Sequence, residues 1–293
     1  MPPDGKRADK AWTLVQKSNR TYLPNALSDA EGQAIRWHSP EAEASSQVFC
    51  ISAFGRLRSL PDGVQILNQL FATTLPNVPP ATRWDLTFEY VDRDVLGETG
   101  QGTATNIDVY CVSPQAVVCI ESKFLFDANE GFGGCGQFRA GDCAGFHGQG
   151  SDRKTPKVPS LCRLEVQDGK RDPRKYWQLG RAYFRDEVFR EQRAGESCPL
   201  AMSNYQLMRN FLFAATTAGA GQEFGVVAMV PEKTATTVTT QVAAFQADVL
   251  REPHRAHINV GTYDALAALL LKSPHQPSIA HGEFLRERMT TLL

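Results

Sequence analysis

The amino-acid sequence predicts an α/β protein with a mixed central sheet. Apolar residues repeat with a helical period between residues 42 and 71, give way to β-rich runs between 84 and 123, and return to a helical period after 203. An apolar run at 224–230 completes the order α–β–β–β–α–β, which is typical of one α/β domain. A chain of 293 residues suffices for one large domain or two small ones. We expect a single domain over residues 1–293.

The N-terminal part is expected to contain an arm and two helices. Residues 1–38 are polar and irregular, which predicts an extended arm. Ser39-Pro40-Glu41 starts a helix over 42–56, because serine caps helices and proline is favoured in their first turn. Pro61-Asp62-Gly63 is a second start signal, and the apolar residues after it keep a helical period.

From Trp84 onward the periodicity becomes that of β-structure. Leu86, Phe88 and Tyr90 alternate with polar residues and predict a strand over 84–92. After a Gly-rich turn come two β-rich runs, Thr105–Val112 and Val117–Lys123. Between them, Ser113-Pro114-Gln115-Ala116 is expected to form a four-residue hairpin loop.

The second half of the chain begins with a long insertion at residues 127–172, rich in Gly, Cys, Pro and charged residues. So long a loop is normally functional, stapled by a metal, or disordered. Helices are expected near 173–192 and 203–218, followed by a buried strand over Phe224–Val230. Residues 231–293 are expected to form an α/β extension. Its predicted elements are helices over 236–250, 263–271 and 282–292 and a strand over 257–260.

The bulk composition is that of a soluble globular protein, with 42% hydrophobic and 22% charged residues. No stretch approaches the ~18–20 apolar residues of a membrane helix. The polar start lacks the apolar core of a secretory signal. We therefore expect no membrane association and a cytoplasmic location.

Charge is unevenly distributed along the chain, although the net charge is only −1. Thr82–Glu130 carries nine acidic and three basic residues, whereas Ser151–Arg181 carries nine basic and four acidic residues. An acidic block beside a basic block suits a metal site next to a phosphate-binding surface. Two solvated faces of unlike charge explain the pattern equally well.

The predicted hairpin brings two carboxylates together. If Val112 pairs with Val117, the same register places Asp108 directly opposite Glu121, with Cβ atoms roughly 4.5–5.5 Å apart. Lys123 lies two residues beyond Glu121 and therefore points to the same face. Apolar neighbours alternate with both carboxylates, so one face of the hairpin is apolar and the other carries the charges.

Two carboxylates this close repel each other unless one is protonated or a cation lies between them. A hard divalent ion relieves the repulsion, and Mg²⁺ is often bound by one or two carboxylates with several waters. The backbone carbonyl of Ser122 is a candidate further ligand. Lys123 would then lie beside the attacking water and stabilise charge on a phosphate. The alternative is a cross-strand ion pair on an exposed sheet face, worth at most ~1 kcal/mol.

These residues resemble a known signature. Asn106-Ile107-Asp108 followed by Ile120-Glu121-Ser122-Lys123 is similar to the D…ExK motif of the PD-(D/E)xK, or restriction-endonuclease-like, nuclease superfamily. The order of elements is similar to that superfamily's αβββαβ core, which would span residues 39–230. Ile107 stands where the family usually has proline.

The resemblance implies a Mg²⁺- or Mn²⁺-dependent nuclease that hydrolyses DNA. Asp108 and Glu121 would bind the ion, and Lys123 would assist the metal-bound water. It also allows a homodimer, because restriction-like enzymes often cut two strands as dimers. No P-loop is present, so any ATP-driven step would need a partner protein.

Three further segments resemble bacterial members of the superfamily: Ser45-Ser46-Gln47, Gly97-Glu98 and Tyr205–Asn210. Glu98 is a candidate third carboxylate ligand of the metal. Gln206 is a candidate catalytic residue that faces the site from its helix. Ordinary surface polarity or helix capping is the alternative for each segment.

Seven cysteines are present, and three of them, Cys50, Cys111 and Cys119, fall in apolar patterns that predict burial. In the insertion, Cys135, Cys143, His147 and Cys162 form a candidate structural zinc site. Cys198 is an alternative fourth ligand, and an all-cysteine set would also suit an iron–sulfur cluster. Unligated thiols in a Gly-rich loop explain the spacing equally well.

Candidate nucleic-acid contacts follow from the basic run that ends the insertion. Arg174, Lys175 and Arg181 are expected near one face of the following helix, and Arg209 lies in the later helical segment. The main alternative to a nuclease is a non-catalytic nucleic-acid-binding module that retains the fold. A hydrolase acting on a small molecule is a third hypothesis, although no Gly-x-Ser-x-Gly nucleophile motif is present.

Overall fold

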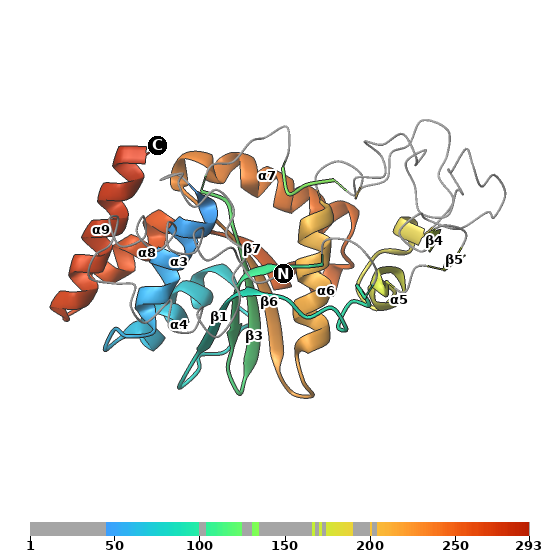
Figure 1. Cartoon of the computed structure of the whole chain (residues 1–293), viewed down its shortest axis with the longest axis horizontal. Coiled ribbons are helices and arrows are strands. Elements are labelled where there is room, and N and C mark those ends of the chain that lie inside the picture. The colour runs from blue at the N-terminus through green and yellow to red at the C-terminus, as the bar shows by residue number, and fades with distance from the viewer. Residues whose placement is uncertain are drawn as a thin grey trace, which may run out of the picture.

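The computed structural model describes residues 45–99, 104–124, 131–134, 166–167, 170–171, 174–189, 200 and 204–292. The predicted N-terminal arm and the Ser39-Pro40-Glu41 start signal lie outside these residues. The described chain is a mixed sheet with helices on both faces, as the sequence predicts (Figure 1).

The central sheet has five strands in the order β1-β2-β3-β6-β7. Strands β1 (Asp85–Tyr90), β2 (Ile107–Val112) and β3 (Ala116–Ser122) run antiparallel to one another. Strand β6 (Glu223–Val230) is parallel to β3, and β7 (Ile258–Thr262) is parallel to β6. The predicted C-terminal extension thus adds a fifth strand to the same sheet.

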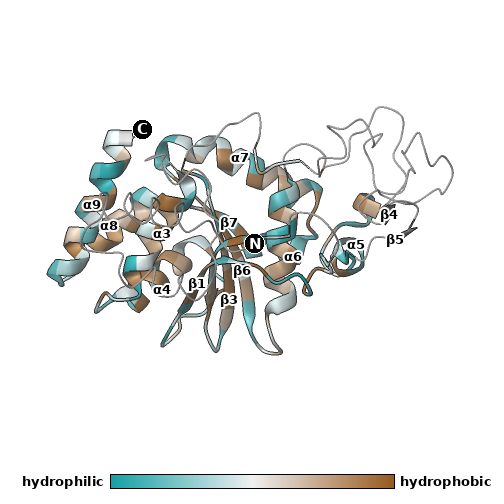
Figure 2. Cartoon of the chain, viewed as in Figure 1, coloured by the Kyte–Doolittle hydropathy of each residue, from teal (hydrophilic) through white to brown (hydrophobic). Residues whose placement is uncertain are grey.

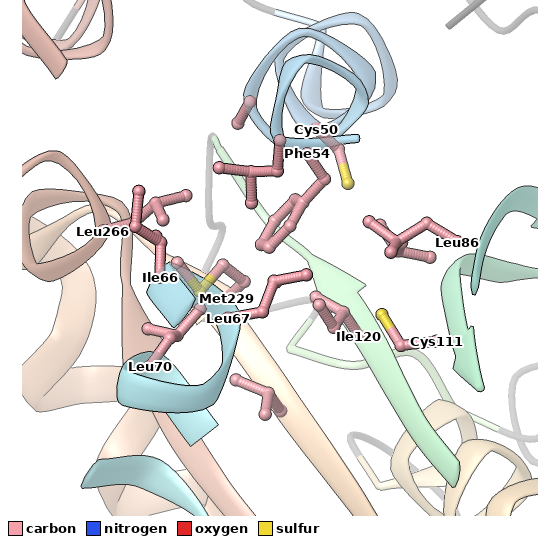
Figure 3. Close-up of a cluster of buried hydrophobic side chains, with 14 of the residues drawn as sticks. Cys50, Phe54, Ile66, Leu67, Leu70, Leu86, Cys111, Ile120, Met229 and Leu266 are labelled. Atoms are coloured by element: carbon pink, nitrogen blue, oxygen red, sulfur yellow. The ribbon is translucent and has the colours of Figure 1, made fainter. Parts of the chain in front are cut away.

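One face of the sheet is covered by α3 (Ser46–Leu57), α4 (Gly63–Thr74) and α8 (Tyr263–Leu271). Helix α9 (Gln276–Leu292) packs on the outer side of α8. Figure 3 shows the core beneath them, where Phe54 of α3 and Leu67 of α4 lie against Ile120 of β3. Cys50 and Cys111 are buried free thiols in this cluster, which confirms their predicted burial.

The other face packs against α6 (Tyr205–Thr217) and α7 (Glu232–Asp248). Phe211 and Phe245 of these helices are buried with Cys119 of β3, another free thiol. Because β3 is covered on both sides, all of its residues are buried. Figure 2 accordingly shows apolar residues along β3 and its neighbouring strands.

The helix starts follow from local chemistry. Ser45 caps α3, and its hydroxyl accepts a hydrogen bond from Val48 N at 3.5 Å. Helix α4 begins at Gly63, as predicted. A Cβ at this position would lie 1.9 Å from the carbonyl oxygen of Leu57, so a larger residue would clash. Glycine at this position lets the start of α4 pack against the end of α3.

The hairpin register is confirmed, since Val112 pairs with Val117 and Val109 with Ile120. The loop is one residue shorter than predicted because Ala116 already belongs to β3. Ser113 closes the turn: its N–H donates to Ala116 O, and its hydroxyl accepts from Ala116 N, both at 2.9 Å.

The prediction of one helix near 173–192 is wrong. Its described part divides into α5 (Tyr176–Gly180) and a 3-10 turn, η1 (Asp186–Phe189). Between them, buried Phe184 forms a β-bridge with Leu250. The Phe184 ring lies so close to Gly180 that a Cβ there would be 2.5 Å from it. Pairing with a distant segment overrides the local helical period.

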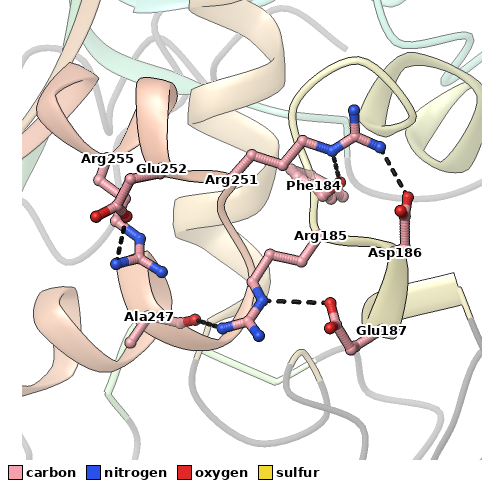
Figure 4. A network of polar contacts seen from close by, with 8 residues as sticks. All are labelled: Phe184, Arg185, Asp186, Glu187, Ala247, Arg251, Glu252 and Arg255. Carbon is pink, nitrogen blue, oxygen red and sulfur yellow. Dashed lines mark hydrogen bonds and ion pairs between the residues drawn. The ribbon is translucent and has the colours of Figure 1, made fainter.

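Figure 4 shows how this segment is fixed to the turn after α7. Arg251 donates from Nε to Phe184 O at 2.7 Å and pairs with Asp186 at 2.8 Å. Backbone hydrogen bonds between residues 183–185 and 249–251 complete the attachment. The segment therefore belongs to the main body of the fold.

The remaining elements are short or peripheral. Strands β4 (Val166–Gln167) and β5 (Lys170–Arg171) form a separate two-stranded sheet within the predicted insertion. A 3-10 turn, η2 (Glu252–His257), precedes β7. Among the described helices, none has the length and apolar character needed to span a bilayer.

Candidate active site

An open cavity of about 570 Å³ lies where the carboxyl end of β3 meets the first turns of α3 and α6. Ligands in open α/β sheets bind at the carboxyl ends of strands, and this volume is within the usual range for ligand sites. The charged residues of its lining are Glu89, Asp108, Glu121, Lys123 and Arg209. Three of these five residues are acidic, so the charge of the lining is mainly negative.

The three residues of the predicted signature meet in this cavity. The confirmed register, continued by one position, puts Asp108 opposite Glu121. Oδ2 of Asp108 accepts a hydrogen bond from Ser122 N at 2.7 Å, which ties the two strands together. Lys123 Nζ lies 2.8 Å from Oε1 of Glu121. Local strand pairing is thus enough to assemble two carboxylates and an ammonium group.

Glu121 is buried, with only 1% of its side chain exposed. A buried carboxylate is costly unless it is paired and hydrogen-bonded. Lys123 supplies the charge, and Asn210 Nδ2 of α6 donates to Oε2 of Glu121 at 2.7 Å. Oε1 lies 2.8 Å from Lys123 Nζ and has no other polar partner within the described part of the chain. A carboxylate oxygen has two lone pairs, so Oε1 can also contact a further cation.

A third carboxylate, Glu89 of β1, also lines the cavity. Because Phe88 pairs with Val109 and Tyr90 with Ile107, Glu89 lies across from Asp108 on the neighbouring strand. Its φ of +50° is in the left-handed region, which is uncommon for a residue other than glycine. Such strained residues cluster at functional sites.

Two amide side chains hold Glu89 in place. Asn106 Nδ2 donates to Oε2 of Glu89, and Gln47 of α3 also hydrogen-bonds the carboxyl group. Glu89, Asp108 and Glu121 thus occupy adjacent positions across β1, β2 and β3. Helix α3 therefore contributes to the site through the predicted Ser45-Ser46-Gln47 segment, which lines the cavity.

Burial and the crowding of acids raise the pKa values of Asp108 and Glu89. Burial raises the pKa of Asp108 well above its usual value, and the nearby charges of Glu121 and Glu89 raise it further. Burial also raises the pKa of Glu89 to about 7, although hydrogen bonds from Asn106 and Gln47 oppose the shift. A bound cation would relieve the repulsion that protons otherwise relieve.

The donor set fits a hard divalent ion bound by few protein ligands. Asp108 Oδ1 has no hydrogen-bond partner among the described residues, and Glu121 Oε1 has none apart from its ion pair with Lys123. Within the described ranges, no three His, Cys, Asp or Glu side chains are arranged to hold a metal ion. Two carboxylates with several waters are a common environment for Mg²⁺. The Ser122 carbonyl remains a predicted further ligand.

Glu98 is not brought to the carboxylate pair and does not line the cavity. It is buried in a separate cluster, where Thr105 donates to it from N at 2.6 Å and from Oγ1 at 2.8 Å. Tyr176 OH of α5 donates to the same carboxylate, and Arg209 Nε lies 3.6 Å from Oε1. Four groups thus surround the carboxylate that the sequence predicts as a metal ligand.

Gln206, a predicted catalytic residue, and Arg209, a predicted nucleic-acid contact, both belong to α6 and line the cavity. The other predicted nucleic-acid contacts are not part of the lining. Lys175 Nζ donates to Asp94 O at 3.0 Å, and the Arg181 guanidinium lies over the Phe189 ring at 4.1 Å. Arg174 lies close enough to Tyr205 to lower the pKa of that phenol, against the dominant effect of burial.

The predicted zinc ligands Cys135, Cys143, His147 and Cys162, and the alternative Cys198, lie outside the described residues.

A family model described as "Restriction Endonuclease associating with ARP" matches residues 4–288. The chain belongs to this family. The match includes every element that contributes to the cavity, from α3 to α6. No curated protein and no solved structure matches the chain.

The sequence analysis does not assign a role to two residues of the site, Glu89 and Asn210. Extending the register from β2 to the strand predicted over 84–92 places Glu89 beside Asp108, since β1 pairs with β2 in a continuous register. Asn210 lies four residues after Gln206 in α6, and residues with this spacing share one helix face. Both signals were therefore present in the sequence.

Proposed function

We propose that this protein is a metal-dependent nuclease that hydrolyses phosphodiester bonds of DNA. The observation that carries the proposal is the meeting of Asp108, Glu121 and Lys123 in one cavity. The likeness to the PD-(D/E)xK signature and membership of a restriction endonuclease family support the same reaction class. A role in restriction or defence follows from the family description.

Asp108 and Glu121 would hold Mg²⁺ or Mn²⁺ through the oxygens that face the cavity. When bound, the ion supplies positive charge that activates water and stabilises charge on the reacting phosphate. Asn210 and Ser122 N keep the two carboxylates oriented, because each occupies one carboxylate oxygen. The proposal that this site binds a divalent ion rests on these oxygens and on the repulsion among the acidic side chains.

Lys123 carries the remaining chemistry. Its ammonium group is held at Glu121 yet has 24% of its side chain exposed, so it can reach a substrate in the cavity. There it would donate hydrogen bonds to the attacking water and to a phosphate oxygen whose negative charge grows in the transition state. Gln206, which lines the same wall, is the candidate for a second contact to the water.

A partner protein is part of the proposal. The family is described as associating with ARP, which supports a partner protein for this chain. A non-catalytic nucleic-acid-binding module is the alternative. The buried Glu121 speaks against it, because binding alone gives no chemical reason to keep this carboxylate beside Asp108.

The proposal is tested by incubating the full chain with supercoiled, linear and single-stranded DNA in Mg²⁺ or Mn²⁺. EDTA and Lys123→Ala are each expected to abolish cleavage. Lys272→Ala is the matched control, since it removes an exposed lysine that is not part of the cavity. Cleavage that survives both EDTA and Lys123→Ala would overturn the mechanism. DNA binding without cleavage in any condition would favour the binding module.

A further inference from the structure

We propose that Arg209 forms a phosphate-binding subsite in the wall of the cavity, and that Glu98 is the positioning residue that holds it there. The ligand is a phosphodiester group of the nucleic acid beside the one that is cut. The inference rests on the proposed nuclease function, because it assumes that nucleic acid enters this cavity.

Arg209 is fixed along one edge of its guanidinium group. Nε donates to Thr105 Oγ1 at 2.8 Å and lies 3.6 Å from Oε1 of Glu98. The guanidinium carbon lies 5.2 Å from the centre of the Tyr205 ring, where a cation is attracted to the ring face. These contacts define the position of the side chain, which is only 14% exposed.

The other edge of the guanidinium remains for a ligand. Across the described ranges, Nη1 and Nη2 of Arg209 have no hydrogen-bond partner, although the residue lines the cavity. Two parallel N–H groups on a planar fork match two oxygens of a phosphate. A fork that is already ordered loses little conformational entropy on binding.

The Glu98 carboxylate is buried and held in a fixed orientation, so it can hold the Arg209 guanidinium in place. Only 3% of its side chain is exposed, and its carboxylate accepts hydrogen bonds from Thr105 N, Thr105 Oγ1 and Tyr176 OH. The Glu98 backbone is also anchored, since its N–H donates to Arg93 O and its carbonyl accepts from Arg93 Nη1. Glu98 thus gives Arg209 a rigid counter-charge on the side away from the ligand edge.

The electrostatics of the cavity require such a cation. Glu89, Asp108 and Glu121 repel the phosphates of an entering strand. Of the described lining residues, Lys123 and Arg209 are the two cations, and Lys123 is paired with Glu121. A nucleic acid that reaches the carboxylates therefore needs Arg209 to bind a neighbouring phosphate.

The test measures DNA binding by the full chain in EDTA, so that no cleavage is required. Arg209→Ala is expected to weaken binding on the order of tenfold and to reduce the slope of log affinity against log salt by about 0.9, the value for one phosphate contact. Arg286→Ala, which removes an exposed arginine of α9, should leave both quantities unchanged. Equal binding by wild type and Arg209→Ala would overturn the subsite.

The positioning role of Glu98 is tested with a double-mutant cycle. Glu98→Gln should weaken DNA binding in the same direction as Arg209→Ala, and the double variant should bind no more weakly than Arg209→Ala alone. Thr105→Val, which removes the hydroxyl between Glu98 and Arg209, should act in the same way and serves if Glu98→Gln does not fold. Additive losses would show that Glu98 acts independently of Arg209.

The outcomes separate this inference from the proposed function. If wild type cleaves DNA with a metal and Arg209→Ala binds DNA as tightly as wild type, the subsite is wrong and the nuclease function stands. If wild type does not cleave DNA and Arg209→Ala binds DNA more weakly, the nuclease function is wrong and the cavity still binds a phosphate. Weaker Mg²⁺ binding by Glu98→Gln in calorimetry, with unchanged DNA affinity, would make Glu98 a metal ligand and overturn its positioning role.

Discussion

Two buried carboxylate–cation pairs lie near each other in this fold but are completed differently. Glu98 faces Arg209 and accepts three hydrogen bonds, so both of its oxygens have hydrogen-bond donors. Glu121 accepts one hydrogen bond from Asn210 on Oε2, while Oε1 contacts Lys123 alone among the described residues. A carboxylate with donors on both oxygens anchors its neighbours, whereas one with spare accepting capacity beside other acids can bind a cation.

The largest difference between the two pairs is expected in catalysis. Asp108→Asn removes one of the carboxylates that would hold the metal, and it should lower the single-turnover cleavage rate on the order of 10³-fold. Glu98→Gln should lower that rate by less than about tenfold at saturating DNA, because it acts through binding. Rates that fall equally in both variants would contradict the division of roles.

The pH dependence of stability should come from the acidic cavity. The native pKa of Glu89 is raised to about 7, so the native state binds this proton more tightly than the unfolded chain. The associated stability is fully present below the ordinary glutamate pKa of about 4.3 and is lost as pH rises through about 7. Glu89→Gln cannot ionise, and in EDTA at pH 8 it should be more stable than wild type by about 3–4 kcal/mol.

Thermal unfolding in EDTA between pH 5 and pH 8 measures this difference. Glu283→Gln, on the exposed side of α9, is the matched control and should follow the wild-type curve. A Glu89→Gln protein whose unfolding temperature falls with pH as steeply as that of wild type would show that Glu89 does not carry the effect.

A smaller effect is expected from Asn210→Ala, which leaves the buried Glu121 carboxylate with Lys123 alone. The loss of a hydrogen bond to a buried charged group should cost about 1–2 kcal/mol of unfolding free energy. Urea denaturation measures the cost. An unchanged free energy of unfolding would mean that Lys123 satisfies Glu121 without help from α6.

The smallest effect is expected where a pair is exposed. Arg83 and Asp85 lie 3.1 Å apart at the start of β1, with side chains 70% and 65% exposed. Arg83→Ala should change the unfolding free energy by no more than about 0.5 kcal/mol, because solvent screens such pairs. A larger loss in the same urea experiment would show that exposure does not separate weak pairs from strong ones here.

Local sequence information was sufficient for the hairpin. A tight turn fixes the register of the strands it joins, so Asp108, Glu121 and Lys123 could be brought together from their positions alone. The mixed sheet and the helices on either side also follow from periodicity. The PD-(D/E)xK resemblance rests on the same short segment.

Long-range packing decided two features that local sequence patterns do not predict. Glu98 is surrounded by residues from distant parts of the chain, since Tyr176 OH donates to Oε1 and Arg209 Nε lies 3.6 Å from the same oxygen. The helix expected over 173–192 is interrupted because Phe184 pairs with Leu250. No local pattern specifies either contact.

Calorimetric titration of Mg²⁺ into the metal-free full chain measures whether Asp108 and Glu121 hold the ion. We expect wild type to bind Mg²⁺, Asp108→Asn and Glu121→Gln to lose this binding, and Glu98→Gln to retain it. Wild-type affinity in Asp108→Asn and Glu121→Gln would show that these two carboxylates do not hold the metal.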